Sequence, residues 1–299
     1  MAAKMIDGKK LAIERRYHKL RDLRGQAGKK PCLAIITVSM YSNEIETASD
    51  VYVHSKQQAC AQINIDCIVI KKSYSYEEIK GRVAQYDLAN TIAMLNEKDS
   101  ITAIMVQLPL PVGIDSRAVL NCISPSKDVD GLTDANMGTL VTHWTYRDIA
   151  PCTPSGIMEL LINERIDLKG KEAVIIGRSN IVGKPMAALL LREDCTVTIC
   201  HSYTENLAQH TRNADILIVA VGKAGFITKD MVKPGAVVID VGINRIDGKI
   251  VGDVSPDVAE VAGYMTPVPG GVGPMTVSCL MENVLNIAIK NKQEKVRNL

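Results

Sequence analysis

The sequence is poor in aromatic residues and carries almost no excess of charge of either sign. Aromatic residues make up 4% of the 299 positions, with one Phe and one Trp, and the formal net charge is +2. Binding of single-stranded nucleic acid usually depends on stacked aromatic rings in a basic groove, so this composition argues against that role. The chain also lacks any apolar run near the roughly 20 residues of a membrane-spanning helix. We therefore expect no nucleic-acid partner and no membrane partner.

Paired cysteine motifs are absent too, although the chain has eight cysteines. None of them forms a Cys-x-x-Cys pair, and several lie within apolar runs, such as Cys32 and Cys200. Buried, reduced thiols are therefore expected rather than metal ligands or disulfides, and no metal site is predicted. The amino-terminal residues carry charges where a secretory signal has an apolar run. These features predict a cytoplasmic protein.

What the sequence does have is a regular alternation of short β-branched runs with helical patterns. Continuous apolar runs favour strands buried on both faces, and their alternation with helices favours parallel sheets, an α/β fold. The expected strands are 33–38, 67–70, 102–107, 173–176, 197–200, 216–221 and 237–241. The expected helices are 11–23, 49–63, 76–95, 155–164, 182–191 and 274–289.

The length and the composition together predict two domains. Hydrophobic residues make up 46% of the chain and charged residues 23%, as in globular proteins, and 299 residues exceed a comfortable single core. The alternation is interrupted between residues 131 and 154. We expect an N-terminal α/β catalytic domain at 1–150 and a doubly wound, Rossmann-like nucleotide-binding domain at 151–274. The final helix, within 275–299, is expected to pack back onto the first domain.

A glycine-containing turn in the second half is typical of nucleotide binding. Gly177-Arg178-Ser179 follows an expected strand, and Gly183 opens an expected helix. Gly177 suits a sharp turn, Gly183 allows the helix to approach the sheet, and N–H groups of the first helical turn are candidates to receive a phosphate. Ser179 stands where the standard motif has its second glycine, so an ordinary strand-to-helix turn stays open as an alternative.

The next expected strand indicates which dinucleotide this turn prefers. Folds that prefer NAD end that strand with an acidic residue on the ribose, but here it ends Cys200-His201-Ser202. The Arg178 cation and the Ser202 hydroxyl suit a 2′-phosphate instead. The sequence therefore predicts NADP as the cofactor.

Tyr52 and Lys56 are four residues apart in an expected helix, which places them on one face, one turn apart. On spacing alone this is an ordinary solvated helix face. The pair also occurs in short-chain dehydrogenases, but those carry their nucleotide-binding glycines before the pair. Here Gly177 follows it, so we reject that assignment.

Six segments taken in order resemble the methylenetetrahydrofolate dehydrogenase/methenyltetrahydrofolate cyclohydrolase family over essentially the whole chain. They are Tyr52-x-x-x-Lys56 and residues 106–111, 127–132, 151–154, 177–185 and 267–276. The resemblance implies NADP-dependent oxidation of 5,10-methylenetetrahydrofolate and hydrolysis of the product to 10-formyltetrahydrofolate, in one-carbon metabolism and purine biosynthesis. It also implies a cytoplasmic homodimer that acts on tetrahydrofolate derivatives, with an active-site cleft between the two domains.

The resemblance also implies roles for four residues. Lys56 matches the catalytic lysine that handles a proton during hydrolysis, where partial burial and a cationic intermediate would disfavour its ammonium form. Gln107 matches a glutamine that hydrogen-bonds this lysine, and Tyr52 matches a tyrosine that packs against the folate. Asp130 matches an aspartate that accepts hydrogen bonds from the pterin. The ordinary alternatives are a polar strand end for Gln107 and a turn residue before Gly131 for Asp130.

The remaining expected contacts also follow the family pattern. For the folate they are Val106, Leu108, Pro269, Gly270, Gly271, Val272 and Gly273, and for the cofactor Gly177, Arg178, Ser179, Ser202, Ile243 and Thr276. The chain departs from the pattern at 39–49, a segment longer than the family's turn and without its glycine and proline, where Ser49 is placed to cap the following helix. Two other functions stay open, a monofunctional NAD-dependent dehydrogenase and a noncatalytic nucleotide-binding protein.

Overall fold

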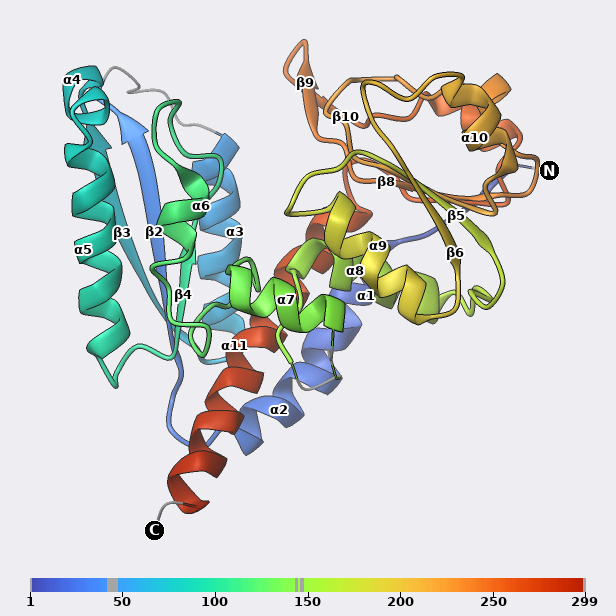
Figure 1. The fold of residues 1–299 in the computed structure, drawn as a ribbon. Coiled ribbons are helices and arrows are strands. Elements are labelled where there is room, and N and C mark those ends of the chain that lie inside the picture. The colour runs from blue at the N-terminus through green and yellow to red at the C-terminus, as the bar shows by residue number, and fades with distance from the viewer. Residues whose placement is uncertain (1, 42–47, 143–144, 146–147, 298–299) are drawn as a thin grey trace. The chain divides into compact units, whose positions relative to one another are not determined.

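The structure is a computed structural model of the chain, and it describes residues 2–41, 48–142, 145 and 148–297 (Figure 1). Most of the unusual segment 39–49 therefore lies outside the described residues. The chain divides into two compact units. Unit 1 comprises Met1–Glu14 and Pro151–Cys279, and unit 2 comprises Arg15–Ala150 and Leu280–Leu299. Each unit contains a parallel sheet, which confirms the expected two-domain α/β fold.

Unit 2 is built on a three-stranded parallel sheet in the order β3-β2-β4, formed by β2 (Cys32–Met40), β3 (Asp66–Tyr74) and β4 (Ala103–Val106). Helix α5 (Val83–Glu97) packs on the face that carries Ala34 and Ile104, where its Leu88 and Ile92 join one buried cluster. Helix α3 (Ala48–Gln62) lies on the other side of the sheet (Figure 1). Because successive strand residues point to opposite faces, Met105 is directed away from α5, toward the α3 side.

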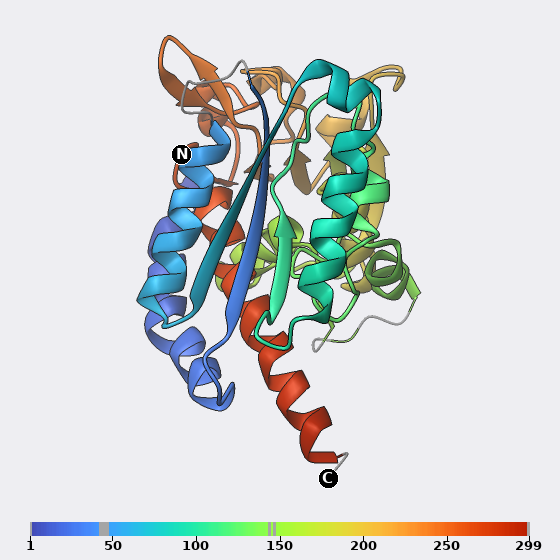
Figure 2. The same cartoon turned by 90° about the vertical axis from the view of Figure 1, so that its left-hand side faces the viewer.

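Several helices in the first half of the chain differ from the sequence prediction (Figure 2). The expected helix 76–95 is interrupted: α4 (Tyr76–Lys80) ends before Arg82, whose φ of 61° is left-handed, and α5 begins after it. The expected helix 11–23 is a succession of α1 (Gly8–Arg15), a π-helical turn (Arg16–Leu20) and α2 (Arg21–Gln26). Two helices were not predicted, α6 (Ser116–Leu120) and α7 (Asp134–Thr142).

Unit 1 contains a six-stranded parallel sheet in the order β1-β11-β8-β7-β5-β6. Its sequence-predicted strands are β5 (Glu172–Ile176), β6 (Thr196–Cys200), β7 (Ile216–Val219) and β8 (Val237–Asp240). After β5 the chain adds β6 on one side and then β7 and β8 on the other. The strand order therefore reverses between β5 and β7, and ligands of doubly wound sheets bind at such a switch point, outside the carboxyl ends of the strands.

The other elements of unit 1 are shorter or cover the sheet. The helices are α8 (Cys152–Asn163), α9 (Gly183–Arg192) and α10 (Leu207–Asn213), with 3-10 turns at Lys229–Met231 and Pro256–Glu260. The sequence did not predict α10, the two-residue strands β1 (Lys4–Met5) and β11 (Tyr264–Met265), or the hairpin of β9 (Asn244–Ile246) and β10 (Lys249–Val251). The buried core includes Val174, Leu217 and Val238.

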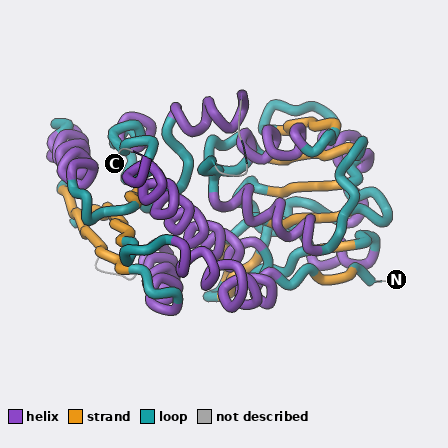
Figure 3. The backbone as a smooth tube through the Cα atoms, turned by 90° about the horizontal axis from the view of Figure 1, so that it is seen from below, coloured by secondary structure: helices purple, strands orange, loops and turns teal. Residues whose placement is uncertain are grey.

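Helix α11 (Val272–Arg297) is one uninterrupted helix that ends near the carboxyl terminus (Figure 3). It begins in unit 1, and its residues from Leu280 onward belong to unit 2. There, the Asn283 amide donates to the carbonyl oxygens of Val129, at 2.9 Å, and Ala150, at 3.1 Å. By length and composition α11 could cross a membrane, but 61% of its apolar window is buried inside the protein, as in an ordinary core helix.

Candidate functional site

A buried lysine and a glutamine meet on one side of the sheet of unit 2. Lys56 on α3 is only 4% exposed, and its Nζ donates a 2.7 Å hydrogen bond to Oε1 of Gln107. The Met105 sulfur lies 3.4 Å from the same nitrogen. Burying an ammonium is unfavourable unless acceptors replace its water, and Gln107 supplies one such acceptor. The structure therefore places together the two residues that the sequence assigned to one proton-handling pair.

Gln107 is held firmly because it directly follows β4. Its backbone N–H donates to the Ile36 carbonyl at 2.8 Å, which continues the β2–β4 ladder by one residue. Its side-chain Nε2 donates to the Leu108 carbonyl at 2.8 Å, so the amide oxygen is the atom left to face Lys56. The amide nitrogen of Gln107 is therefore the donor to the backbone, and its amide oxygen is the acceptor for Lys56, held at a fixed position.

Tyr52 lies one helical turn before Lys56 and is half-buried. Burial raises the pKa of its phenol above the ordinary value. At neutral pH the side chain is therefore an uncharged hydroxyl on an apolar ring, which suits packing against an aromatic substrate and does not suit a base. Val106 differs from the expectation of a direct contact, because its side chain is buried in the core of unit 2.

Asp130 lies in a loop that is fixed on both sides. Before it, the Lys127 ammonium donates to the carbonyl oxygens of Leu95, Asn96 and Lys98 at 3.2, 2.7 and 2.8 Å, at the end of α5. Burial lowers the pKa of Lys127. The next residue, Asp128, is buried. Oδ2 of its carboxylate accepts hydrogen bonds from the Thr133 N–H at 2.8 Å and from the Asn136 amide at 2.9 Å. The half-buried Asp130 is thus presented by a rigid turn.

The turn of unit 1 from Gly177 to Gly183 has the tight geometry that its glycines predicted. Gly177 has a φ of 122°, and a Cβ there would overlap the Ala220 carbonyl oxygen; a Cβ at Gly183 would overlap the carbonyl oxygen of Gly177. Only glycine allows these approaches.

The donors available at this turn differ from the prediction. The N–H groups of Val182 and Gly183 donate to Oγ of Ser179, at 3.1 and 3.5 Å, and the Lys184 N–H donates to the Ser179 carbonyl at 3.0 Å. The start of α9 is therefore satisfied by Ser179. Among the described residues, the N–H groups of 178–181 donate to no other group, so the turn itself, before the helix, offers donors to a phosphate.

Arg178 and Ser202 both lie at the carboxyl edge of the sheet, after neighbouring strands. Ile176 and Cys200 are register partners of β5 and β6, and the two candidate residues stand two positions after them. Both are exposed, and the Arg178 guanidinium carbon lies 5.7 Å from the ring centroid of Tyr203, a cation–π distance. Sequence analysis missed Tyr203, which is 81% exposed and directly follows Ser202.

The expected folate contacts of unit 1 lie in the loop that follows β11 and in the first residues of α11. Gly270 has a φ of 113°, and its carbonyl accepts from the Lys9 N–H at 2.8 Å. A Cβ at Gly271 would meet Thr266 and the Pro267 carbonyl at 2.7 Å, so this loop requires glycine. Pro269 is exposed and Gly273 is half-buried, whereas the Val272 side chain is buried.

Two other expected cofactor contacts are also in unit 1. Ile243 is 46% exposed after β8. Thr276 is half-buried on α11, with its hydroxyl 3.1 Å from that of Thr153.

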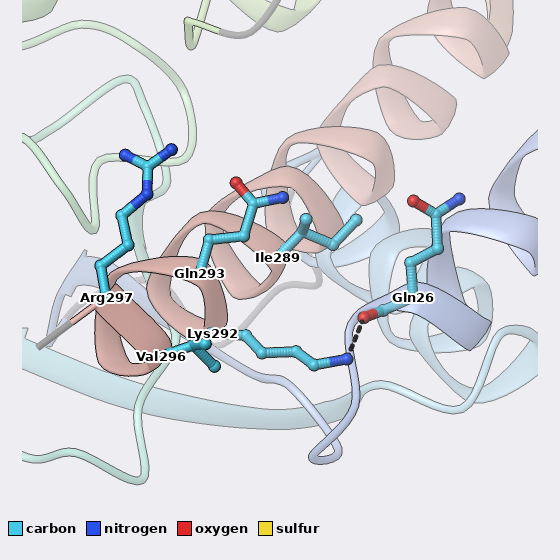
Figure 4. A pocket seen from close by; sticks show the side chains of 6 residues that line it. All are labelled: Gln26, Ile289, Lys292, Gln293, Val296 and Arg297. Atoms are coloured by element: carbon cyan, nitrogen blue, oxygen red, sulfur yellow. Dashed lines mark hydrogen bonds between the residues drawn. The ribbon is translucent and has the colours of Figure 1, made fainter. Parts of the chain in front are cut away.

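Two cavities of the structure lie apart from most of these residues. One of about 440 Å³ is lined in unit 2 by Gln26, Ile289, Lys292, Gln293, Val296 and Arg297, and none of these is a candidate (Figure 4). Another, of about 500 Å³, adjoins Asp240 and Thr266 in unit 1. Within the described part of the chain, no three His, Cys, Asp or Glu side chains are grouped to hold a metal ion.

Comparison with known proteins adds evidence from the whole chain. Residues 6–130 match the family model for the catalytic domain of tetrahydrofolate dehydrogenase/cyclohydrolase, and residues 151–292 match the model for its NAD(P)-binding domain. Over 285 residues the chain is 49% identical to the bifunctional protein FolD of Methanospirillum hungatei, covering 95% of this chain and 97% of that protein.

Two solved structures are similar over nearly their full length. The bifunctional FolD methylenetetrahydrofolate dehydrogenase/cyclohydrolase of Campylobacter jejuni has a TM-score of 0.88 and 44% identity, covering 97% of this chain and 100% of that one. The FolD dehydrogenase-cyclohydrolase of Trypanosoma brucei, solved with NADP and an inhibitor, has a TM-score of 0.87 and 36% identity, covering 98% and 99%.

Proposed function

Because this chain belongs to the tetrahydrofolate dehydrogenase/cyclohydrolase family, we propose that it oxidises 5,10-methylenetetrahydrofolate with NADP and hydrolyses the product. The second step converts 5,10-methenyltetrahydrofolate to 10-formyltetrahydrofolate. The observation that carries the proposal is the buried hydrogen bond from Lys56 to Gln107, which supports a proton-handling role for this lysine. Both activities belong to one-carbon metabolism, where 10-formyltetrahydrofolate would supply purine biosynthesis.

The residues of unit 1 fit the dinucleotide. The tight Gly177 turn leaves the N–H groups of 178–181 to a phosphate, and Arg178 with Ser202 offers a cation and a hydroxyl to a 2′-phosphate. When bound, NADP accepts the hydride that leaves the folate carbon. That carbon lies between two nitrogens, so its oxidation releases no proton and needs no general base. The role of this chain in the first step is to orient the folate, through Tyr52 and Asp130.

Hydrolysis makes a different demand on the chain. Water attacks the methenyl carbon, a proton leaves, and the ring opens, so a proton acceptor must lie beside the one-carbon unit. We assign that role to Lys56, with Gln107 holding its nitrogen in place and Tyr52 packing on the same helix face. Asp130 would accept hydrogen bonds from the amino-pyrimidine edge of the pterin. The glycines at 270, 271 and 273 would let backbone approach the ligands closely.

The other expectations stay proposals of the same kind. We propose that the protein works as a cytoplasmic homodimer on tetrahydrofolate derivatives, without nucleic-acid or membrane partners. All eight cysteines are free thiols, which supports a reducing compartment. The active-site cleft between the two domains stays a prediction. A monofunctional NAD-dependent enzyme and a noncatalytic protein are not favoured, because both would leave the buried Lys56–Gln107 pair without a task.

A spectrophotometric assay tests this function. The purified chain is mixed with methylenetetrahydrofolate and either NADP or NAD, and methenyl formation is followed by absorbance; methenyltetrahydrofolate alone is supplied to follow its hydrolysis. We expect oxidation with NADP well above that with NAD, and hydrolysis without any cofactor. Oxidation with NAD and no hydrolysis would support the monofunctional alternative, and no turnover of either substrate would support the noncatalytic one.

A further inference from the structure

Two carboxylates that the proposed mechanism does not use are buried at the carboxyl edge of the sheet in unit 1. Asp240 ends β8 and is 2% exposed, and Asp253 follows β10 and is 0% exposed. They are joined, because the Asp253 N–H donates to Oδ1 of Asp240 at 2.9 Å. Carboxylates are rarely buried unless hydrogen bonds replace the water around them. The groups that donate hydrogen bonds to these two carboxylates therefore indicate their structural role.

Asp253 accepts from three successive backbone amides. Its Oδ2 accepts from the N–H groups of Val221, at 2.7 Å, and Gly222, at 2.9 Å, and its Oδ1 accepts from Lys223 at 2.8 Å. Successive N–H groups that converge in this way form a concave anion site. Here the protein's own carboxylate fills that site, so the loop 221–223 is closed around Asp253 and does not offer these donors to a phosphate.

The loop 221–223 lies beside the position expected for a bound dinucleotide. Residues 221–223 follow β7, and β7 borders the switch point between β5 and β7. The turn on the other side of that point begins at Gly177, which approaches the Ala220 carbonyl so closely that no Cβ fits between them. With the 2′-phosphate end expected at Arg178 and Ser202 and the pyrophosphate at the Gly177 turn, the nicotinamide half extends toward β7 and β8.

The same two carboxylates fix the neighbouring loop that carries Ile243. On one side of Ile243, the Gly242 N–H donates to Oδ1 of Asp240 at 3.0 Å. On the other side, the Asn244 amide donates to Oδ1 of Asp253 at 2.8 Å. Ile243 is therefore held between two anchored residues while its own side chain remains 46% exposed. A Cβ at Gly242 would overlap the Asp253 carboxylate, so the packing leaves no space for another arrangement.

We propose that Asp253 is a positioning residue for the cofactor, which holds the loops 221–223 and 242–244 against the nicotinamide half of the dinucleotide. This inference rests on the proposed NADP-dependent function. It makes a distinctive claim, because the nicotinamide half is identical in NADP and NAD. Loss of the carboxylate must therefore weaken both cofactors equally, unlike loss of a residue that binds the 2′-phosphate.

The test compares Asp253→Asn with the matched control Asp215→Asn. Asp215 precedes the opposite, amino end of β7, accepts from the Glu172 N–H at 3.0 Å and pairs with Lys233 at 2.7 Å, so it also binds backbone with a carboxylate. For Asp253→Asn we expect KM for NADP and KM for NAD to rise by the same factor, about tenfold, because buried donors lose their acceptor. Hydrolysis of methenyltetrahydrofolate, which needs no cofactor, should stay within about twofold. The control should leave all three values unchanged.

Three results would overturn the proposal: unchanged cofactor KM values in folded Asp253→Asn, a rise for NADP alone, or a parallel loss of oxidation and hydrolysis. If Asp253→Asn does not fold, Asn244→Ala removes one donor to the same carboxylate, and a smaller equal rise of about threefold is expected; no rise would overturn the proposal. Calorimetric titration of NADP without folate gives the dissociation constant directly. Failure of the proposed folate activity is thereby distinguished from failure of this inference.

Discussion

The Lys56 side-chain nitrogen and the Gln107 side-chain oxygen are 2.7 Å apart, although the two residues are separated by 50 others in sequence. Helix α3 supplies the lysine and the end of β4 supplies the glutamine. Because the lysine is almost fully buried, this contact fixes its nitrogen at one place. The position of that nitrogen is what a proton transfer to or from a bound substrate depends on.

Replacing Lys56 should separate the two proposed activities. In Lys56→Ala we expect hydrolysis of methenyltetrahydrofolate to fall by at least about 10²-fold, the usual contribution of a positioned general base or acid. Oxidation of methylenetetrahydrofolate should persist, since it releases no proton. Absorbance assays of both steps measure this, with the exposed Lys71→Ala on β3 as control. A near-normal hydrolysis rate in Lys56→Ala would remove this lysine from the mechanism.

Replacing Arg178 should change the choice of cofactor. Arg178 is exposed after the end of β5, where we expect the 2′-phosphate that NADP carries and NAD lacks. In Arg178→Ala we expect KM for NADP to rise at least about tenfold, the loss of one charge-assisted contact, with KM for NAD nearly unchanged. Arg212→Ala on α10, which loses a surface pair with Asp230, serves as control. Equal effects on both cofactors would place the 2′-phosphate elsewhere.

Two glycine-to-alanine changes should act in opposite directions. At Gly183 the added methyl group would overlap the Gly177 carbonyl, so Gly183→Ala should destabilise the fold by about 1–3 kcal/mol and weaken NADP binding. At Gly138, in the middle of α7, nothing lies within 4 Å of the added atom. Gly138→Ala should therefore stabilise the fold by about 0.5–1 kcal/mol through helix propensity. Urea denaturation measures both changes, and a stabilising Gly183→Ala would contradict the close approach of the turn.

The buried Asp240 should impose a pH dependence on stability. Burial raises the pKa of its carboxyl from 3.8 to about 6. Between these values the folded chain keeps a proton that the unfolded chain has lost, so the contribution of Asp240 to the free energy of unfolding falls as the pH rises. The difference between wild type and Asp240→Asn should fall by about 2 kcal/mol from pH 4 to pH 7.

Asp215 provides the opposite sign, because hydrogen bonding to Lys233 lowers the pKa of its carboxyl. The contribution of Asp215 to stability is present above the ordinary pKa of an aspartate and is lost as the pH falls below it. Urea denaturation of wild type and both single variants between pH 3 and pH 7 measures the two slopes. Identical slopes for the two variants would show that Asp240 titrates normally in the folded chain.

The buried parallel strands were predictable from sequence because continuous runs of β-branched apolar residues favour strands that are buried on both faces. The runs that contain Ile35 and Ile218 are strands at the centres of the two sheets. What sequence did not predict depends on contacts made far along the chain. Strand β1 is only Lys4–Met5 and exists because Tyr264–Met265 lies beside it, and the break at Arg82 depends on one left-handed residue.

The site was predictable only in part, for a similar reason. The Lys56–Gln107 contact joins two segments whose residue types are common, and resemblance to a family, not spacing, singled them out. Asp253 was not identified because its partners are backbone amides about 30 residues earlier, and backbone amides leave no signature in a sequence. Likewise, the sequence did not predict that N–H groups at the start of α9 are already hydrogen-bonded, because this depends on the direction of the Ser179 hydroxyl.

The threefold hydrogen bonding of Lys127 restricts what can stand at that position. An ammonium has three N–H bonds arranged as a tripod, and here each has a carbonyl acceptor at the end of α5. A guanidinium is flat and cannot direct its donors to three acceptors around one point. Arginine would therefore be a poor substitute, and acetylation would leave a single N–H for three oxygens. Lys127 lies in a motif that resembles a binding or catalytic segment, but its role is structural, because it stabilises the carboxyl end of α5.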